Sequence, residues 1–117
     1  LAQQWTSDAV AVSGGGYEEV PTEPWDLIIN GTSTGLSNEM PALSSSMIFA
    51  PQCRGYDMAY GRAPTPFMAW AREQGVAEVM DGLGMLVEQA AESFFLWRGE
   101  YPETPSVVSS LRAESGG

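Results

Sequence analysis

The sequence predicts an α/β fold: the second half of a doubly wound parallel sheet, followed by C-terminal helices. The apolar run from Trp25 to Asn30 shows no alternation of apolar and polar residues, which is typical of a parallel strand covered on both faces. The segments that follow alternate between strand-like and helical patterns, as expected when helices connect parallel strands. These two observations predict the fold class.

The composition fits one globular domain. The chain has 117 residues, 44% of them hydrophobic, and a net charge of -10. This acidic balance argues against binding to nucleic acids or anionic membranes. The sequence contains no histidine and no lysine, which excludes a Ser-His nucleophile pair, a histidine-ligated zinc site, a Schiff base and a P-loop.

Cysteine content and hydropathy predict the compartment. Cys53 is the single cysteine, so an internal disulfide is excluded and a reducing environment is expected. No apolar run reaches the roughly 18 to 20 residues of a membrane span, and the N-terminus lacks the pattern of a signal peptide. We therefore expect a soluble cytoplasmic protein.

The first quarter of the chain predicts little regular structure. Leu1 to Trp5 resembles the end of an amphipathic helix and lacks an N-cap, which suggests a fragment of a longer protein. Val10 to Val12 predicts a short strand, and Tyr17 to Pro24 an acidic connection. The strand from Trp25 to Asn30 then ends at the glycine-flanked turn Gly31 to Gly35.

The central segments predict two further strands and a helix. Ser44 to Ser46 is expected to cap a short helical turn over Met47 to Phe49. Cys53 to Met58 is predicted to form the next strand, and Val76 to Met80 the one after it. Between them, Thr65 to Gly75 predicts a helix with threonine at the N-cap, proline in first position and glycine just past the end.

The remaining segments predict two helices. Asp81 is the expected N-cap of a helix over Gly82 to Trp97, which Gly99 ends. Tyr101 to Pro105 is a proline-rich link, and Ser106 to Glu114 a short final helix. One face of the long helix is expected to carry Leu83, Leu86, Val87, Ala90, Phe94 and Trp97.

Three loops follow the predicted strands, at the edge where open α/β sheets bind ligands. They begin at Asn30, Asp57 and Asp81. The first is rich in glycine and hydroxyls, so a ligand can approach its backbone, although an ordinary turn is the simpler interpretation. The third places Gly82 and Gly84 at a helix N-terminus, which favours negative charge. This signal is weak, because Val87 stands where a dinucleotide fingerprint has its third glycine.

Spacing alone leaves the polar and sulfur-containing side chains ambiguous. Gln89 can donate and accept hydrogen bonds, but a surface or packing role is more frequent for such a residue. Tyr60 fits a core anchor, and Met58 and Met85 fit core filler. The residues themselves therefore predict an α/β candidate for nucleotide binding with undefined chemistry.

Taken together, three segments resemble the shikimate dehydrogenase family, in the family's order. They are Asp26 to Gly35, Tyr56 to Tyr60 with Thr65 to Phe67, and Asp81 to Ala91. The resemblance implies a Rossmann-type NADP-binding domain. It also implies reduction of 3-dehydroshikimate to shikimate with NADPH, by direct hydride transfer and without a metal, in chorismate and aromatic amino-acid biosynthesis.

The resemblance also implies roles for individual residues. Three residues of the first loop would lie against the NADP cofactor, namely Gly31, Thr32 and Ser33. Four residues would surround the nicotinamide end, namely Met58, Gly82, Met85 and Leu86. Tyr60 and Gln89 would hydrogen-bond the carboxylate or hydroxyls of the substrate.

By the same resemblance, residues 1–85 form a partial NADP-binding domain and residues 86–117 form helices that pack back on an N-terminal substrate domain. The family's catalytic lysine and its partner aspartate belong to that domain, and this sequence has no lysine. The glycine-rich phosphate turn and the arginine motif that reads the 2′-phosphate are also missing. We expect the isolated chain to be inactive and to self-associate. The alternatives are a quinate/shikimate dehydrogenase paralogue that prefers NAD, or a non-catalytic binding module.

Overall fold

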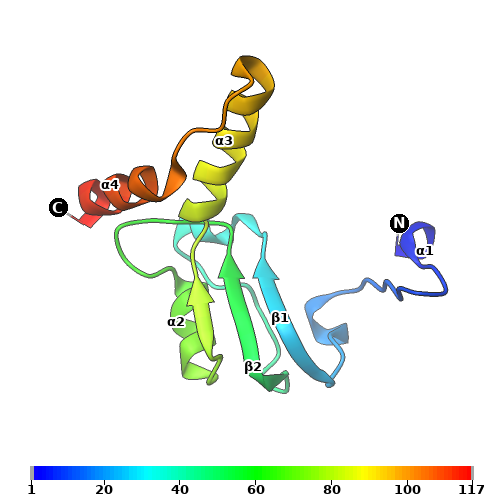
Figure 1. Cartoon of the computed structure of the whole chain (residues 1–117). Helices are drawn as coiled ribbons and strands as arrows, with labels where there is room; N and C mark the ends of the chain where they lie inside the picture. Colours follow the sequence, from blue (N-terminus) through cyan, green and yellow to red (C-terminus); the bar gives the residue numbers. More distant parts are fainter. Residues whose placement is uncertain (1, 117) are drawn as a thin grey trace.

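The computed structural model describes residues 2–116 and contains a three-stranded parallel sheet (Figure 1). The strands are β1 (Pro24–Asn30), β2 (Ile48–Asp57) and β3 (Glu78–Met80), and they lie in the order β1-β2-β3. Helix α2 (Pro66–Glu73) lies between β2 and β3 in the chain and covers one face of the sheet. The predicted parallel α/β arrangement is confirmed.

The core lies between α2 and the sheet. Cys53 of β2 and Ala71 of α2 are fully buried, and Val76 completes the centre of this cluster. Ile28 of the neighbouring strand β1 packs against this cluster, and so do three half-buried side chains from β2, α2 and β3. These are Phe49, Trp70 and Val79. Burying these apolar surfaces supplies the main stabilisation of the sheet and helix pair.

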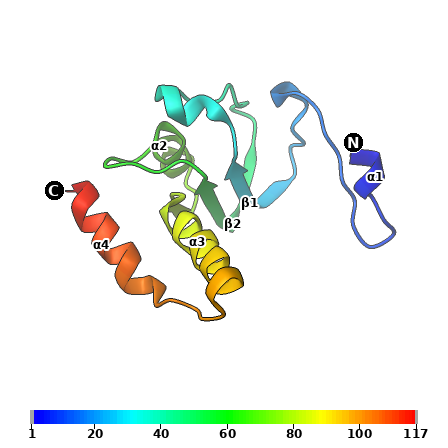
Figure 2. The same cartoon turned by 90° about the horizontal axis from the view of Figure 1, so that it is seen from above.

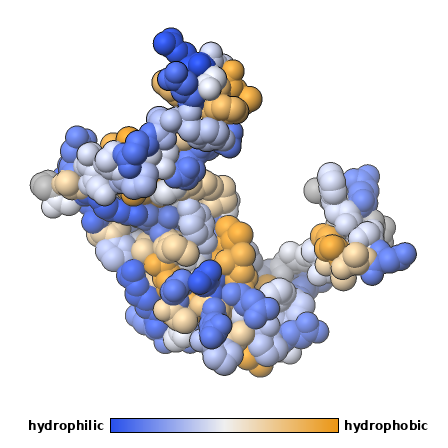
Figure 3. Space-filling view, in the orientation of Figure 1, coloured by the Kyte–Doolittle hydropathy of each residue, from blue (hydrophilic) through white to orange (hydrophobic). Residues whose placement is uncertain are grey.

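The opposite face of the sheet is open to solvent over β1. Leu27 and Ile29 are 53% and 58% exposed, and Figure 3 shows apolar side chains gathered over this strand. The expectation that β1 is covered on both faces is therefore wrong within residues 2–116. Only alternate residues of the strand, such as Ile28, reach the layer beneath α2.

Helix α2 begins and ends where its local sequence predicts. The Thr65 hydroxyl accepts a hydrogen bond from the Met68 backbone N–H at 3.2 Å, and Pro66 occupies the first turn. Gly75 follows the helix with a φ of 83°, a conformation that residues with a Cβ rarely adopt. Local capping signals are sufficient to define this element.

Two short elements expected from the sequence are not formed. Val10 to Val12 is not a strand, because the Val12 backbone N–H and C=O bond the Thr6 hydroxyl at 3.1 and 2.9 Å. The predicted helical turn over Met47 to Phe49 is also wrong. Ile48 and Phe49 instead begin β2, where they pair with Pro24 and Trp25 of β1 in register.

The N-terminal segment extends away from the sheet (Figures 1 and 2). It contains helix α1 (Ala2–Trp5) and the 3-10 turn η1 (Tyr17–Glu19). A second 3-10 turn, η2 (Ser33–Ser37), follows β1. None of the helices formed by residues 2–116 combines the length and apolar character that a membrane crossing requires.

Two helices complete the chain. Helix α3 (Leu83–Arg98) ends at Gly99, which adopts a φ of 75°. Helix α4 (Thr104–Gly116) begins two residues before the predicted start and runs back alongside α3 (Figure 2). The buried side chains of α3 are spaced one turn apart and are Leu83, Val87 and Ala91. Trp97, expected on the same face, is 81% exposed.

Candidate functional site

The carboxyl ends of the three strands lie side by side, and the loops that follow them are hydrogen-bonded to one another. The Met58 backbone N–H donates to the Asn30 carbonyl at 3.0 Å, which joins the first two loops. The Gly82 backbone N–H donates to the Ala59 carbonyl at 3.0 Å, which joins the second and third. The structure thus brings together three loops that are far apart in the sequence.

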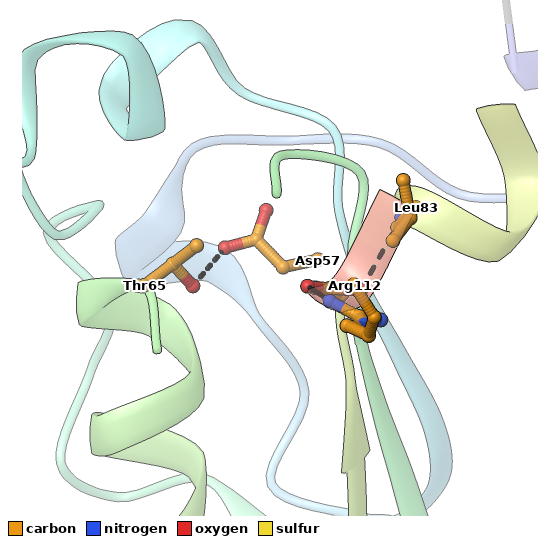
Figure 4. A network of polar contacts seen from close by, with 5 residues as sticks. Asp57, Thr65, Leu83 and Arg112 are labelled. Atoms are coloured by element: carbon orange, nitrogen blue, oxygen red, sulfur yellow. Dashed lines mark hydrogen bonds and ion pairs between the residues drawn. The ribbon is translucent and has the colours of Figure 1, made fainter. Parts of the chain in front are cut away.

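A buried carboxylate organises this edge. Asp57, the last residue of β2, is 1% exposed. Its Oδ1 accepts from the Asn30 amide at 3.2 Å and from the Ala59 backbone at 3.0 Å. Its Oδ2 accepts from the Thr65 hydroxyl at 2.5 Å (Figure 4). These donors offset the cost of removing a charge from water.

The same network fixes the first loop. Asn30 is 5% exposed, and its Oδ1 accepts from the backbone N–H of Thr32 at 3.2 Å and from the Thr32 hydroxyl at 2.7 Å. The Thr34 hydroxyl lies 2.7 Å from that of Thr32. Because the single hydroxyl proton of Thr32 goes to Asn30, Thr34 is the donor in this pair. Both polar groups of Thr32 are therefore held in place, and Ser33 follows with an exposed side chain.

Met58 lies between two glycines that belong to the other loops. A Cβ on Gly82 would lie 2.0 Å from the Met58 carbonyl oxygen, so only glycine fits there. A Cβ on Gly31 would lie 3.1 Å from the Met58 sulfur. Met58 itself is 45% exposed. Gly31, Met58 and Gly82 therefore form one contiguous ledge, called the glycine-methionine ledge below.

Asp81 connects this ledge to α4. Its Oδ2 and Oδ1 accept from Nη1 and Nη2 of Arg112 at 2.5 and 2.6 Å, and Oδ1 also accepts from the Leu83 backbone at 3.3 Å (Figure 4). The N-cap of α3 is Gly82, one residue later than predicted. Asp81 nevertheless bonds the first turn, so its own charge occupies the position that favours an anion.

The ion pair shifts the protonation equilibrium of Asp81. Hydrogen bonding to Arg112 lowers the pKa of the Asp81 carboxyl, partial burial opposes this shift, and the Leu83 N–H adds to the lowering. The Asp81 side chain is 8% exposed and that of Arg112 is 49% exposed. Asp81 is therefore a largely buried carboxylate whose charge is paired with the Arg112 guanidinium.

The other predicted site residues have different surroundings. Tyr60 is 49% exposed and Met85 is 36% exposed. Gln89 is also exposed and lies one helical turn beyond Met85 on α3, so both residues are on the same side of that helix. Leu86 is half-buried and lines a groove between α3 and α4.

The residues that support the ledge were not assigned a site role from the sequence. They are Asn30, Asp57, Thr65 and Arg112. A usable signal exists for the first two, since each ends a strand and parallel register pairs them. Arg112 carries no comparable signal, because it lies 31 residues from Asp81.

Comparison with known proteins identifies related sequences. The family model "Shikimate 5'-dehydrogenase C-terminal domain" matches residues 82–112. The chain is 56% identical over 91 residues to the shikimate dehydrogenase (NADP(+)) of Alkalilimnicola ehrlichii, covering 78% of this chain and 33% of that protein. It is 49% identical over 114 residues to the one of Dechloromonas aromatica, covering 97% and 41%. The chain thus spans between 33% and 41% of the length of these two relatives.

Solved structures show the same relationship. Shikimate 5-dehydrogenase from Thermus thermophilus, in complex with shikimate, superposes with a TM-score of 0.60 at 28% identity, covering 79% of this chain and 34% of that one. A chorismate mutase/shikimate 5-dehydrogenase fusion protein from Clostridium acetobutylicum superposes with a TM-score of 0.72 at 27% identity, covering 86% and 38%.

Substitution of Gly82 tests the close contact in the ledge. We expect Gly82→Ala to lower the free energy of unfolding by about 1–3 kcal/mol, because the Met58 backbone must move to admit a Cβ. Gly84→Ala is the matched control: nothing lies within 4 Å of its Cβ position, and alanine favours a helix by up to about 1 kcal/mol. Urea unfolding measures both variants, and equal stability of the two would contradict the contact.

The Asp81–Arg112 pair predicts a pH dependence. Because the folded pKa of Asp81 is lowered, its contribution is fully present above the unfolded pKa of about 3.9 and is lost as pH falls through the folded value. Asp81→Asn should therefore reduce stability by about 1 kcal/mol at pH 7, a small value because Arg112 is half exposed.

Urea unfolding at a series of pH values measures this difference. The gap between the original chain and Asp81→Asn should close as the pH falls below about 4. Asp8→Asn, at an exposed position in the N-terminal segment, serves as the control. A gap of constant size across the acid range would contradict the prediction.

Proposed function

Because the chain corresponds in sequence and fold to the C-terminal part of shikimate dehydrogenases, we propose that it forms the nicotinamide side of an NADP-dependent active site. The proposed reaction is the reduction of 3-dehydroshikimate to shikimate in aromatic amino-acid biosynthesis. The observation that carries this proposal is the glycine-methionine ledge, in which Gly31, Met58 and Gly82 meet although they come from three separate motif segments.

The residues present suit one end of the cofactor. Gly31 is exposed, the Thr32 hydroxyl is held by Asn30, and Met58 and Met85 are 45% and 36% exposed. A flat, largely apolar ring fits such a ledge. We propose Gly31, Thr32 and Ser33 as cofactor contacts, with Met58, Gly82, Met85 and Leu86 around the nicotinamide. Leu86 would reach it from the edge of the α3–α4 groove.

The phosphates of the dinucleotide would need binding groups other than those of the ledge. A phosphate at the N-terminus of α3 would meet the Asp81 carboxylate, which already bonds the Leu83 N–H. These 117 residues also carry no glycine-rich phosphate turn. The proposal therefore assigns only the nicotinamide end to this chain.

We propose Tyr60 and Gln89 as substrate ligands. Both side chains are exposed, and each can donate as well as accept a hydrogen bond, which suits a substrate rich in hydroxyls. When bound, NADPH would supply a hydride to the substrate carbonyl carbon. The residues of this chain would hold the two reactants in register, while the family's catalytic lysine and aspartate belong to the N-terminal domain of the whole enzyme.

We also propose how this chain is divided between the domains of the whole protein. Residues 1–85 would belong to the NADP-binding domain and residues 86–117 to helices that pack on the substrate domain, a division that falls within the first turn of α3. Exposed Leu27 and Ile29 support self-association of the isolated chain. The net charge of -10 supports a protein that binds neither nucleic acid nor anionic membranes. The single cysteine supports a reducing compartment such as the cytoplasm.

The isolated chain should show no dehydrogenase activity. General acid/base catalysis contributes about 10²–10⁴-fold in rate, and the sequence has no lysine or histidine to supply it. The near-ultraviolet absorbance of reduced nicotinamide, recorded with shikimate and NADP⁺ and again with NAD⁺, measures turnover. Clear activity would mean that a carboxylate or a tyrosine does this work and that the assigned roles are wrong.

Grafting tests the proposed site in a complete enzyme. The chain would replace the matching segment of the Dechloromonas aromatica relative, which aligns with 97% of it, and the graft should oxidise shikimate with NADP⁺. Gln89→Ala in this graft should lower kcat/KM for shikimate by about 5- to 150-fold, equivalent to a lost hydrogen bond of about 1–3 kcal/mol.

Gln74→Ala, at the exposed end of α2, is the matched control and should leave kcat/KM unchanged. An inactive graft that is correctly folded would count against the proposed function. An active graft in which the Gln89→Ala and Gln74→Ala variants behave alike would remove Gln89 from the substrate site.

A further inference from the structure

We propose that Arg112 is a positioning residue: through Asp81 it holds the Gly82 turn against Met58 and so sets the geometry of the glycine-methionine ledge. The positioning of Gly82 by Arg112 follows from contacts within the chain alone. Its consequence for nicotinamide binding rests on the proposed function.

Asp81 is fully engaged by two elements at once. Oδ2 accepts from Arg112, and Oδ1 accepts both from Arg112 and from the first backbone N–H of α3, that of Leu83. The carboxylate also follows β3 directly and precedes Gly82. It therefore connects the end of the sheet, the start of α3 and the side chain of Arg112 on α4.

The backbone of Gly82 is in close contact with the second loop, at Met58 and Ala59. Its N–H bonds the Ala59 carbonyl at 3.0 Å, and its Cα faces the Met58 carbonyl so closely that a Cβ would stand 2.0 Å away. A displacement of the Asp81 side chain is therefore transmitted to Met58, because packed backbone atoms cannot absorb it by compression.

Little of helix α4 is buried, so the ion pair contributes to its position. None of the described side chains of α4 is buried, and Val107 is 43% exposed. Its apolar contact with α3 leaves an open groove of about 370 Å³, lined by residues that include Leu86, Phe94 and Leu111. Such a shallow contact permits sliding, whereas a bidentate ion pair fixes both distance and orientation.

Arginine is required for this role. Its planar guanidinium presents two parallel N–H donors that match the two carboxylate oxygens. A lysine would keep the charge but offer a point contact, so it should restore the position of Asp81 only in part. A partial effect of Arg112→Lys would therefore show that the geometry of the guanidinium matters as well as its charge.

Methyl NMR of the 117-residue chain, labelled at the methionine methyl groups, tests the inference. Arg112→Gln should shift the signals of Met58 and Met85, and Asp81→Asn should shift them in the same direction. The double variant should shift them no further, since both changes break one interaction. Arg112→Lys should give an intermediate shift, and Arg98→Gln, at the exposed end of α3, should give none.

Val107→Ala separates the ion pair from general loosening of α4, because it trims the groove without touching Asp81. Shifts at Met58 as large as those of Arg112→Gln would overturn the proposal, as would unshifted signals in a folded Arg112→Gln chain. If Arg112→Gln does not fold, Arg112→Lys decides: signals identical to the original chain would overturn the proposal.

A kinetic measurement in the grafted enzyme tests the consequence. Arg112→Gln should raise the KM for NADP⁺ by about tenfold, the equivalent of one charge-assisted hydrogen bond, with a smaller change in the KM for shikimate. An inactive graft together with the expected methyl shifts would reject the proposed function and leave the positioning role standing. An active graft without methyl shifts would reject the positioning role alone.

Discussion

The buried Asp57 carboxylate is the constraint on which the carboxyl edge of the sheet depends. A charge at 1% exposure is tolerated only when donors surround it, and here they come from Asn30, the Ala59 backbone and Thr65. Because the Thr65 hydroxyl also caps α2, one carboxylate joins β1, β2 and α2. Loss of any donor would leave a buried charge partly unpaired.

This hydrogen-bond network leaves a buried layer and an exposed layer at the carboxyl edge of the sheet. Asn30 and Asp57 are buried and hydrogen-bonded to each other, while Met58 and Tyr60, immediately beyond Asp57, are 45% and 49% exposed. A ligand site needs both properties, since exposed groups bind and buried groups keep them in place. Thr32 lies at the boundary, because its polar groups are held by Asn30 while the next residue is open to solvent.

The ends of helices could be predicted from the sequence where residues close in the chain set them. Thr65 and Gly75 mark the ends of α2 because capping acts within one turn, and Gly99 marks the end of α3 for the same reason. The neighbouring strand ends follow from parallel pairing alone. The Asp81–Arg112 pair spans 31 residues and depends on how α4 packs, which no local pattern specifies. The false strand over Val10 to Val12 fails similarly, because propensity does not supply a partner strand.

The ledge is built from neutral groups in a strongly acidic chain. At a net charge of -10, an anionic cofactor or a substrate carboxylate would be repelled by any free carboxylate nearby. Two aspartates stand at this edge: Asp81 is paired with the Arg112 guanidinium, and Asp57 is buried and hydrogen-bonded by three neutral donors. In the proposed function, a ligand would therefore face glycine backbone, hydroxyl, amide and thioether groups. In this arrangement Arg112 both orients the ledge and offsets a charge that would oppose binding to it.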